Sequence, residues 1–228
     1  MFFVAEKDFE LNVEKVYNTL QKEFEKYQKP VVDTIESATK DPFKILITTI
    51  LSARTKDTTT EKVVIELFKK IKKPDDFNKY STEEIEKMIY PVGFYKNKAI
   101  HLKKFPEVLE KEFNNNIPDE IDNLIKLPGV GRKTANLVRA IAFKKSAICV
   151  DTHVHRISNR LGYVKTKTPL ETEMVLRKKL PEEYWIMYNS YLVSFGQNHC
   201  FPRNPKCSSC VIYDECKRVG VQTKYEKK

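Results

Sequence analysis

The sequence predicts an all-α protein, and composition, periodicity and missing hairpin signals support this. The chain has 228 residues, 41% of them hydrophobic, with only 6 Gly and 11 Pro, so turn-rich β-architectures have little support. Apolar residues recur at helical spacing along most of the chain, and only residues 147–150 could be extended. No Asn-Gly or Asp-Gly pair lies between alternating runs. The length suffices for one large or two small domains with a hydrophobic core.

Several helices begin at recognisable capping residues. From Asn12 onward, apolar side chains recur at helical spacing among charged neighbours. Asp41-Pro42 supplies a capping residue and a first-turn proline ahead of the apolar run 43–51, and Ser81 opens a capping box. With these starts, the chain holds roughly ten helices. The other helices are expected at about 57–71, 96–113, 119–127, 132–144, 152–161, 169–180 and 182–196.

The charge balance favours an anionic partner. The 41 Lys and Arg residues exceed the 31 Asp and Glu residues, which gives a net charge of +10; nucleic acid is the first candidate. A Lys-rich solvated surface is the alternative. Apolar stretches such as 45–51 are shorter than the roughly 20 residues of a membrane span. We therefore expect no span, no signal peptide and a cytoplasmic location, associated with the nucleoid if the source is prokaryotic.

A glycine-containing turn lies between two predicted helices. Residues 127–135, LPGVGRKTA, form a helix-hairpin-helix signature, in which two glycines allow a tight turn and the next helix offers unpaired N–H groups to a phosphate. A nucleotide P-loop spaces its glycines differently, and an ordinary glycine turn is the alternative. We expect nucleic-acid contacts from Gly129, Val130, Gly131, Arg132 and Thr134.

Four of the five cysteines lie close together near the C-terminus. Cys200, Cys207, Cys210 and Cys216 are separated by six, two and five residues. Nothing indicates an oxidising compartment, so a shared metal centre explains them better than disulfides. One short knuckle with longer arms favours a [4Fe-4S] cluster over zinc, which stays the alternative. A loaded cluster lowers the net charge to about +8. We expect Cys149 to be a buried hydrophobe.

A third motif, Val-Asp-Thr-His at 150–153, places Asp151 18 residues after Lys133. A helix over 132–144 carries the chain about 20 Å away, and an extended 146–151 segment returns about the same distance. We therefore expect Lys133 and Asp151 to meet. Asp151 is also a predicted N-cap. His153 is expected to be structural or to contact phosphate rather than to transfer protons.

In their order and spacing these motifs resemble the endonuclease III family of helix-hairpin-helix DNA glycosylases. The resemblance runs from about 45 to 216 and includes Leu-Ser-Ala at 51–53 and Gly-Phe-Tyr at 93–95. It implies two lobes with DNA in the cleft between them. The expected domains are a helical barrel with the hairpin at 35–145, and a discontinuous iron–sulfur domain at 1–34 plus 146–228.

By the same resemblance, Lys133 falls on the family's Schiff-base lysine and Asp151 on its catalytic aspartate. This implies a monomeric, bifunctional N-glycosylase and apurinic/apyrimidinic lyase that flips oxidised pyrimidines out of duplex DNA and cleaves the strand by β-elimination. Relatives with Ser or Tyr at position 133 resemble monofunctional glycosylases, so the lysine favours lyase activity. The alternatives are a uracil or thymine mismatch glycosylase and a non-catalytic DNA-binding module.

Two expected DNA-contacting positions depart from the family pattern. Arg54 stands where the family commonly has a Gln that fills the gap left by the flipped nucleotide, and Phe94 stands where a Leu is often found in the wedge loop. An arginine can bind a guanine edge bidentately, which suggests a preference for lesions or mismatched pyrimidines opposite G; a phosphate or surface role is the alternative. For Phe94 and Tyr95, burial in the core is favoured over insertion into DNA. Helical spacing also predicts core positions for Tyr184, Trp185, Tyr188, Tyr191 and Phe195.

Overall fold

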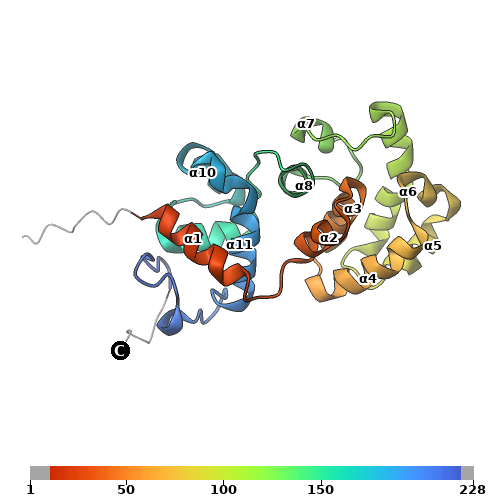
Figure 1. The fold of residues 1–228 in the computed structure, drawn as a ribbon. Helices are drawn as coiled ribbons and strands as arrows, with labels where there is room; N and C mark the ends of the chain where they lie inside the picture. The colour runs from red at the N-terminus through yellow and green to blue at the C-terminus, as the bar shows by residue number, and fades with distance from the viewer. Residues whose placement is uncertain (1–10, 222–228) are drawn as a thin grey trace, which may run out of the picture. The chain divides into compact units, whose positions relative to one another are not determined.

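The computed structural model describes residues 11–221, which form eleven α-helices and three short 3-10 helices with no strand among them (Figure 1). The all-α prediction is confirmed. This part of the chain divides into two compact units. We call residues 29–149 and 185–187 the hairpin unit, and residues 11–28, 150–184 and 188–221 the cysteine unit. No helix in residues 11–221 has the length and apolar character needed to cross a membrane.

The helices are numbered in chain order, and Figure 1 labels most of the α-helices. The hairpin unit contains α2 (Val31–Thr39), α3 (Pro42–Ser52), α4 (Asp57–Lys70), η1 (Pro74–Lys79), α5 (Thr82–Ile89), α6 (Tyr95–Phe113), α7 (Ile121–Leu124) and α8 (Arg132–Phe143). The cysteine unit contains α1 (Val13–Phe24), α9 (Thr152–Leu161), α10 (Pro169–Lys179), η2 (Glu182–Tyr184), α11 (Trp185–Asn198) and η3 (Cys207–Ser209), and the first three residues of α11 group with the hairpin unit.

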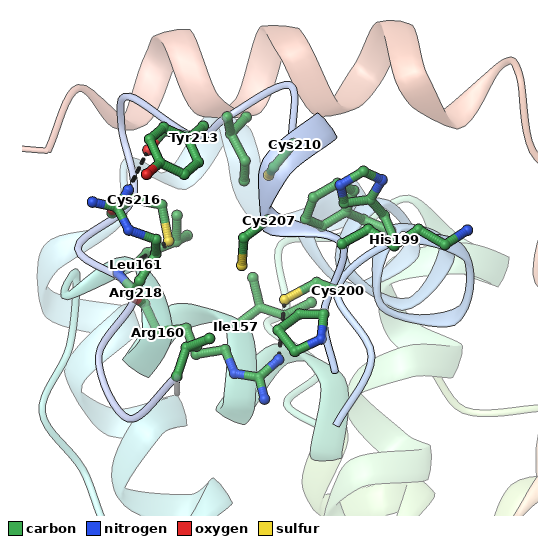
Figure 2. Close-up of a pocket in the computed structure, with 15 residues that line it drawn as sticks. Ile157, Arg160, Leu161, His199, Cys200, Cys207, Cys210, Tyr213, Cys216 and Arg218 are labelled. Atoms are coloured by element: carbon green, nitrogen blue, oxygen red, sulfur yellow. Dashed lines mark hydrogen bonds between the residues drawn. The ribbon is translucent and has the colours of Figure 1, made fainter. Parts of the chain in front are cut away.

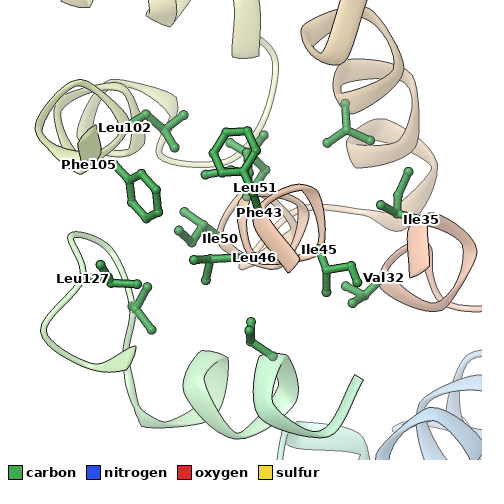
Figure 3. Close-up of a cluster of buried hydrophobic side chains, with 14 of the residues drawn as sticks. Val32, Ile35, Phe43, Ile45, Leu46, Ile50, Leu51, Leu102, Phe105 and Leu127 are labelled. Carbon is green, nitrogen blue, oxygen red and sulfur yellow. The ribbon is translucent and has the colours of Figure 1, made fainter. Parts of the chain in front are cut away.

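Helix α3 is the centre of the hairpin unit. It packs against α2, α4, α6 and α8, and its apolar run is buried on several sides (Figure 3). Ile45, Leu46 and Leu51 are fully buried, and each such side chain contributes about 1.5–3 kcal/mol to stability. Asp41 starts the helix by accepting a hydrogen bond from Phe43 N at 2.9 Å. This core fixes the loops at the end of α3 and the start of α8.

The predicted helix starts agree with the structure at every capping residue named above. The side chains of Asn12, Asp41, Ser81 and Asp151 each accept a hydrogen bond from a first-turn N–H. The aromatic residues Tyr188, Tyr191 and Phe195 are buried as expected, whereas Tyr184 and Trp185 are half-buried.

Three segments differ from the sequence-based expectations. Helix α2 was not expected, because it is short and begins at Pro30, which has no capping side chain. The helix expected at 119–127 shortens to α7, since Pro128 disfavours helical backbone in the preceding residue; tight turns at 123–127 replace its end. Residues 147–150 have no assigned secondary structure, so the segment expected to be possibly extended makes no strand.

Candidate functional site

The turn between α7 and α8 holds two glycines with different tasks. Gly129 has φ +79°, a conformation that favours glycine, and a Cβ there would make a tight contact of 3.0 Å with His101 Nδ1 on α6. Gly131 is the N-cap of α8 with φ −94°, and a Cβ there would meet nothing within 4 Å. Val130 is 7% exposed and holds the turn to the core. The backbone at Gly131 is therefore open to a ligand.

The first turn of α8 presents its charged residues to the surface. Arg132 and Lys133 are exposed, whereas Thr134 is 8% exposed. The buried face of the same helix, including Val138 and Ile141, packs in the core that α3 dominates. The positive end of the α8 dipole and two cations thus lie at the open side of the turn. A phosphate is the ligand that this arrangement favours.

A second exposed feature of the hairpin unit pairs Arg54 with Phe94. Both residues have left-handed backbone, with φ values of 55° and 58°, and the Arg54 guanidinium carbon lies 5.1 Å from the centre of the Phe94 ring. Such a pair is a cation–π contact. It combines a planar cation with an aromatic ring on a surface, and these are groups suited to bases that have left the duplex stack.

The expected burial of Phe94 is wrong. Its side chain is 58% exposed, because Phe94 is the N-cap of α6 and its left-handed backbone takes it out of the helical face. Tyr95, the first residue of α6, is half-buried against the core and packs edge-on against Tyr90 at 5.4 Å. Helical periodicity cannot predict the direction of a residue whose backbone is not helical.

In the cysteine unit, Asp151 caps the N-terminus of α9. Its Oδ1 accepts hydrogen bonds from His153 N at 2.8 Å and Val154 N at 2.9 Å. His153 is held in turn, since its Nδ1 lies 3.2 Å from Arg156 Nη2 and any Cβ on Gly196 of α11 would collide with it. These contacts fix the ring of His153, for which the sequence predicts a structural or phosphate-contacting role.

Four cysteines line one pocket of the cysteine unit (Figure 2). Ile157 and Leu161 of α9 form part of the same lining. Within residues 11–221, no three His, Cys, Asp or Glu side chains converge as ligands of a single metal ion; the cysteines surround a space instead. The set is Cys200, Cys207, Cys210 and Cys216.

The pocket suits an anionic iron–sulfur group with thiolate ligands. Burial raises the pKa of the Cys210 thiol to about 12, so a thiolate there needs a bound cation such as iron. Arg160 Nη1 donates to Cys200 Sγ at 3.3 Å, and Arg218 N donates to Cys216 Sγ at 3.4 Å. Donors to ligand sulfurs stabilise negative charge in such clusters. Cys149, in contrast, is buried in the core of the hairpin unit, as expected.

Sequence comparisons identify the combination of hairpin and cysteine pocket. Residues 47–182 match the HhH-GPD superfamily of base excision DNA repair proteins, and residues 200–216 match the iron–sulfur binding domain of endonuclease III. The chain is 47% identical to endonuclease III of Thermotoga maritima over 176 residues, which cover 77% of this chain and 83% of that protein. The chain belongs to the endonuclease III family. It is thus a base excision repair DNA glycosylase with a [4Fe-4S] cluster.

Solved structures agree with this family assignment. A trapped covalent intermediate of endonuclease III with DNA superposes with a TM-score of 0.81 at 37% identity, over 90% of this chain and 94% of that one. A thermostable thymine-DNA glycosylase superposes with a TM-score of 0.79 at 27% identity, over 90% and 95% of the two chains. The endonuclease III structures with DNA support DNA binding by this family member.

Sequence reasoning missed three positively charged residues at these sites. Arg156 donates to Cys200 O at 2.8 Å, and Arg160 donates to Phe201 O at 2.7 Å. Lys98 donates to backbone carbonyls beside the loop of Arg54. Arginines at four-residue spacing on α9 could have been noticed, because they share one helical face. No local sequence pattern distinguishes Lys98 from the many exposed lysines.

Proposed function

We propose that this endonuclease III family member excises oxidised pyrimidines from duplex DNA and cleaves the strand through a Schiff base on Lys133. The observation that carries the proposal is the place of Lys133, exposed in the first turn of α8 two residues after Gly131. A phosphate bound at the turn holds the nucleotide backbone beside this amine. Gly129, Val130, Gly131 and Arg132 make that contact, and Thr134, which is buried, contributes its backbone N–H.

In the proposed reaction, the unprotonated Lys133 amine attacks C1′ of a flipped-out nucleotide. The C1′–N glycosidic bond breaks, and the base leaves with a proton as the amine loses one. The sugar ring then opens as the C1′–O4′ bond breaks and O4′ takes a proton, which leaves a lysine–C1′ imine. The imine acidifies the C2′ proton, whose removal expels the 3′ phosphate by β-elimination. The carboxylate of Asp151 stabilises positive charge on the sugar and helps generate the free amine. Both of its capping bonds use Oδ1, so Oδ2 serves the substrate.

Chain connectivity supports a shared role for Lys133 and Asp151. Within the hairpin unit, Cys149 Sγ donates to the Lys133 carbonyl oxygen at 3.6 Å. Two residues of extended chain span at most about 7 Å, so covalent geometry keeps Asp151 close to Cys149. His153 follows in the first turn of α9. Its contact with Arg156 orients the ring, and the proposed phosphate contact uses the ring in that orientation.

The same proposal assigns the cluster ligands and the working form of the enzyme. Cys200, Cys207, Cys210 and Cys216 each bind one iron of the [4Fe-4S] cluster, which is structural and stabilises the loop that carries them. The enzyme acts as a monomer on duplex DNA with damaged or mismatched bases. Its place is the cytoplasm, at the nucleoid if the source is prokaryotic.

A second candidate is a mismatch glycosylase on the same scaffold, which the likeness to the thymine-DNA glycosylase favours. A panel of duplexes, each with one oxidised pyrimidine, uracil opposite G or thymine opposite G, separates the two. We expect excision of the oxidised pyrimidines at rates well above those of the mismatches. Excision of the mismatches alone would support the second candidate.

Arg54 is proposed to set the preference for the opposite base. Its guanidinium is exposed beside Phe94 and matches the two acceptors of a guanine edge. We expect wild-type enzyme to excise one oxidised pyrimidine faster opposite G than opposite A, and Arg54→Ala to reduce that ratio. A ratio unchanged by the substitution would leave Arg54 with a phosphate-contacting role.

A further inference from the structure

Lys98 is a buried lysine in the first turn of α6. Its side chain is 6% exposed, and its Nζ donates to Leu51 O at 2.8 Å and to Ala53 O at 2.7 Å. These carbonyls end α3, where the helix dipole is negative. An ammonium group removed from water is costly unless it is paired, so the two carbonyls are the partners that make the burial of Lys98 tolerable.

Thr55 joins the same contact to a second loop. Lys98 Nζ lies 3.4 Å from Thr55 Oγ1, and Gly93 N donates to that oxygen at 3.0 Å. The two loops are also in close backbone contact, because a Cβ on Gly93 would collide with the Arg54 carbonyl oxygen. Lys98 and Thr55 thus connect residues 51–55 to residues 93–98.

Each of these loops carries one half of the exposed cation–π pair. Arg54 precedes Thr55, and Phe94 follows Gly93. Both have left-handed backbone, a conformation that persists in non-glycine residues only when the surroundings enforce it. The hydrogen bonds that Lys98 donates and Thr55 accepts join the two loops.

We propose that Lys98 and Thr55 are positioning residues that hold Arg54 and Phe94 as one rigid unit for contact with the gap left by a flipped-out nucleotide. They act through the two loops and touch no DNA. The inference rests on the proposed DNA contacts of Arg54 and Phe94, and it predicts that loss of the bond network weakens recognition of a gap more than binding to intact duplex.

The test measures affinity for two duplexes, one intact and one with a tetrahydrofuran abasic analogue opposite G. We expect Lys98→Met to weaken binding to the abasic duplex about tenfold and binding to intact duplex less than about twofold. Thr55→Val should show the same selective loss, and Thr55→Ser, which keeps the hydroxyl, should restore wild-type affinity.

Lys103→Met is the matched control. Lys103 also lies on α6 and donates to backbone carbonyls, but these belong to Asn78 and Tyr80 at the C-terminal end of η1, at 3.2 and 2.7 Å. Its loss should leave the ratio of the two affinities at the wild-type value. Equal losses in Lys98→Met and Lys103→Met would overturn the inference, because they would indicate a general effect on folding.

A double-mutant cycle tests the route of the effect. In an Arg54→Ala/Phe94→Ala background, Lys98→Met should weaken binding to the abasic duplex by less than about twofold more. Substitutions that act through the same residues are not additive, and here the residues that Lys98 positions are already gone. A full tenfold addition would overturn the inference. If Lys98→Met does not fold, as helical circular dichroism would show, Thr55→Val and Thr55→Ser decide the question.

The outcomes also separate this inference from the proposed function. A wild-type enzyme that binds both duplexes equally would contradict the proposed gap recognition by Arg54 and Phe94. If the wild-type enzyme prefers the abasic duplex and Lys98→Met and Thr55→Val keep that preference, only the positioning role is contradicted.

Discussion

Asp151 combines a structural and a proposed chemical task in one side chain. As N-cap of α9 it satisfies two backbone N–H groups, and as a carboxylate it supplies the charge that the proposed reaction needs. Asparagine caps a helix nearly as well as aspartate but has no charge. The two tasks can therefore be separated by substitution at this residue.

We predict that Asp151→Asn changes the free energy of unfolding by less than about 0.5 kcal/mol, whereas Asp151→Ala lowers it by about 1 kcal/mol. Both variants should lose base excision by about a hundredfold or more. Thermal unfolding and single-turnover excision measure the two effects. Wild-type excision by Asp151→Asn would show that only the cap matters.

Burial lowers the pKa of Lys98 to about 8, and it has no carboxylate partner in the described part of the chain. Because the folded state disfavours the charged form, the contribution of Lys98 to stability should rise with pH between about 8 and the ordinary lysine value of 10.5. We predict one lysine side-chain NMR signal that titrates near pH 8.

That signal should be absent in Lys98→Met and present in Lys133→Gln, which distinguishes Lys98 from the proposed nucleophile. A Lys98 resonance that titrates together with those of the exposed lysines would contradict the burial of the Lys98 amine.

At the scale of elements, the hairpin depends on two glycines for different reasons. Gly129→Ala should lower stability by about 1–2 kcal/mol, because alanine at φ +79° is strained. Gly131→Ala should have little effect on stability, since its φ is −94° and the space around it is open. Chemical denaturation of both variants measures these changes in stability. Equal losses would contradict the view that only Gly129 is needed for its backbone conformation.

The sequence predicted most elements and motifs, but it did not predict features that depend on tertiary structure. Caps such as Asp41 and Ser81 are local, and a few neighbouring residues specify them. Phe94 was misplaced because its left-handed backbone depends on the packed loop of Arg54. Lys98 was missed because its acceptors lie more than 40 residues away, and nothing local marks a lysine for burial.

At the scale of the whole molecule, the net charge of +10 favours a polyanion over a small neutral substrate. The cluster lowers it only to about +8. Part of this positive charge lies on the surface of the hairpin unit, at the exposed cations of the hairpin and at Arg54. Cations that neutralise phosphates release condensed counterions when DNA binds.

We predict a slope of about −3 or steeper for the logarithm of the association constant against the logarithm of salt concentration, as expected for three or more phosphate contacts. Arg132→Ala should reduce the magnitude of the slope by about one. Fluorescence anisotropy with an abasic-analogue duplex between 50 and 200 mM salt, a range of about fourfold, measures it. A flat profile would contradict the electrostatic account.

Borohydride trapping on a duplex with one oxidised pyrimidine tests the central claim most directly, because reduction fixes a lysine–sugar imine as a permanent bond. We predict a covalent protein–DNA adduct with the wild type and none with Lys133→Gln. Both preparations should bind the duplex, and both should show the broad absorption band of an iron–thiolate cluster at about 400 nm. An undiminished adduct in Lys133→Gln, or DNA binding by the wild type with no adduct, would contradict a Schiff base at this residue.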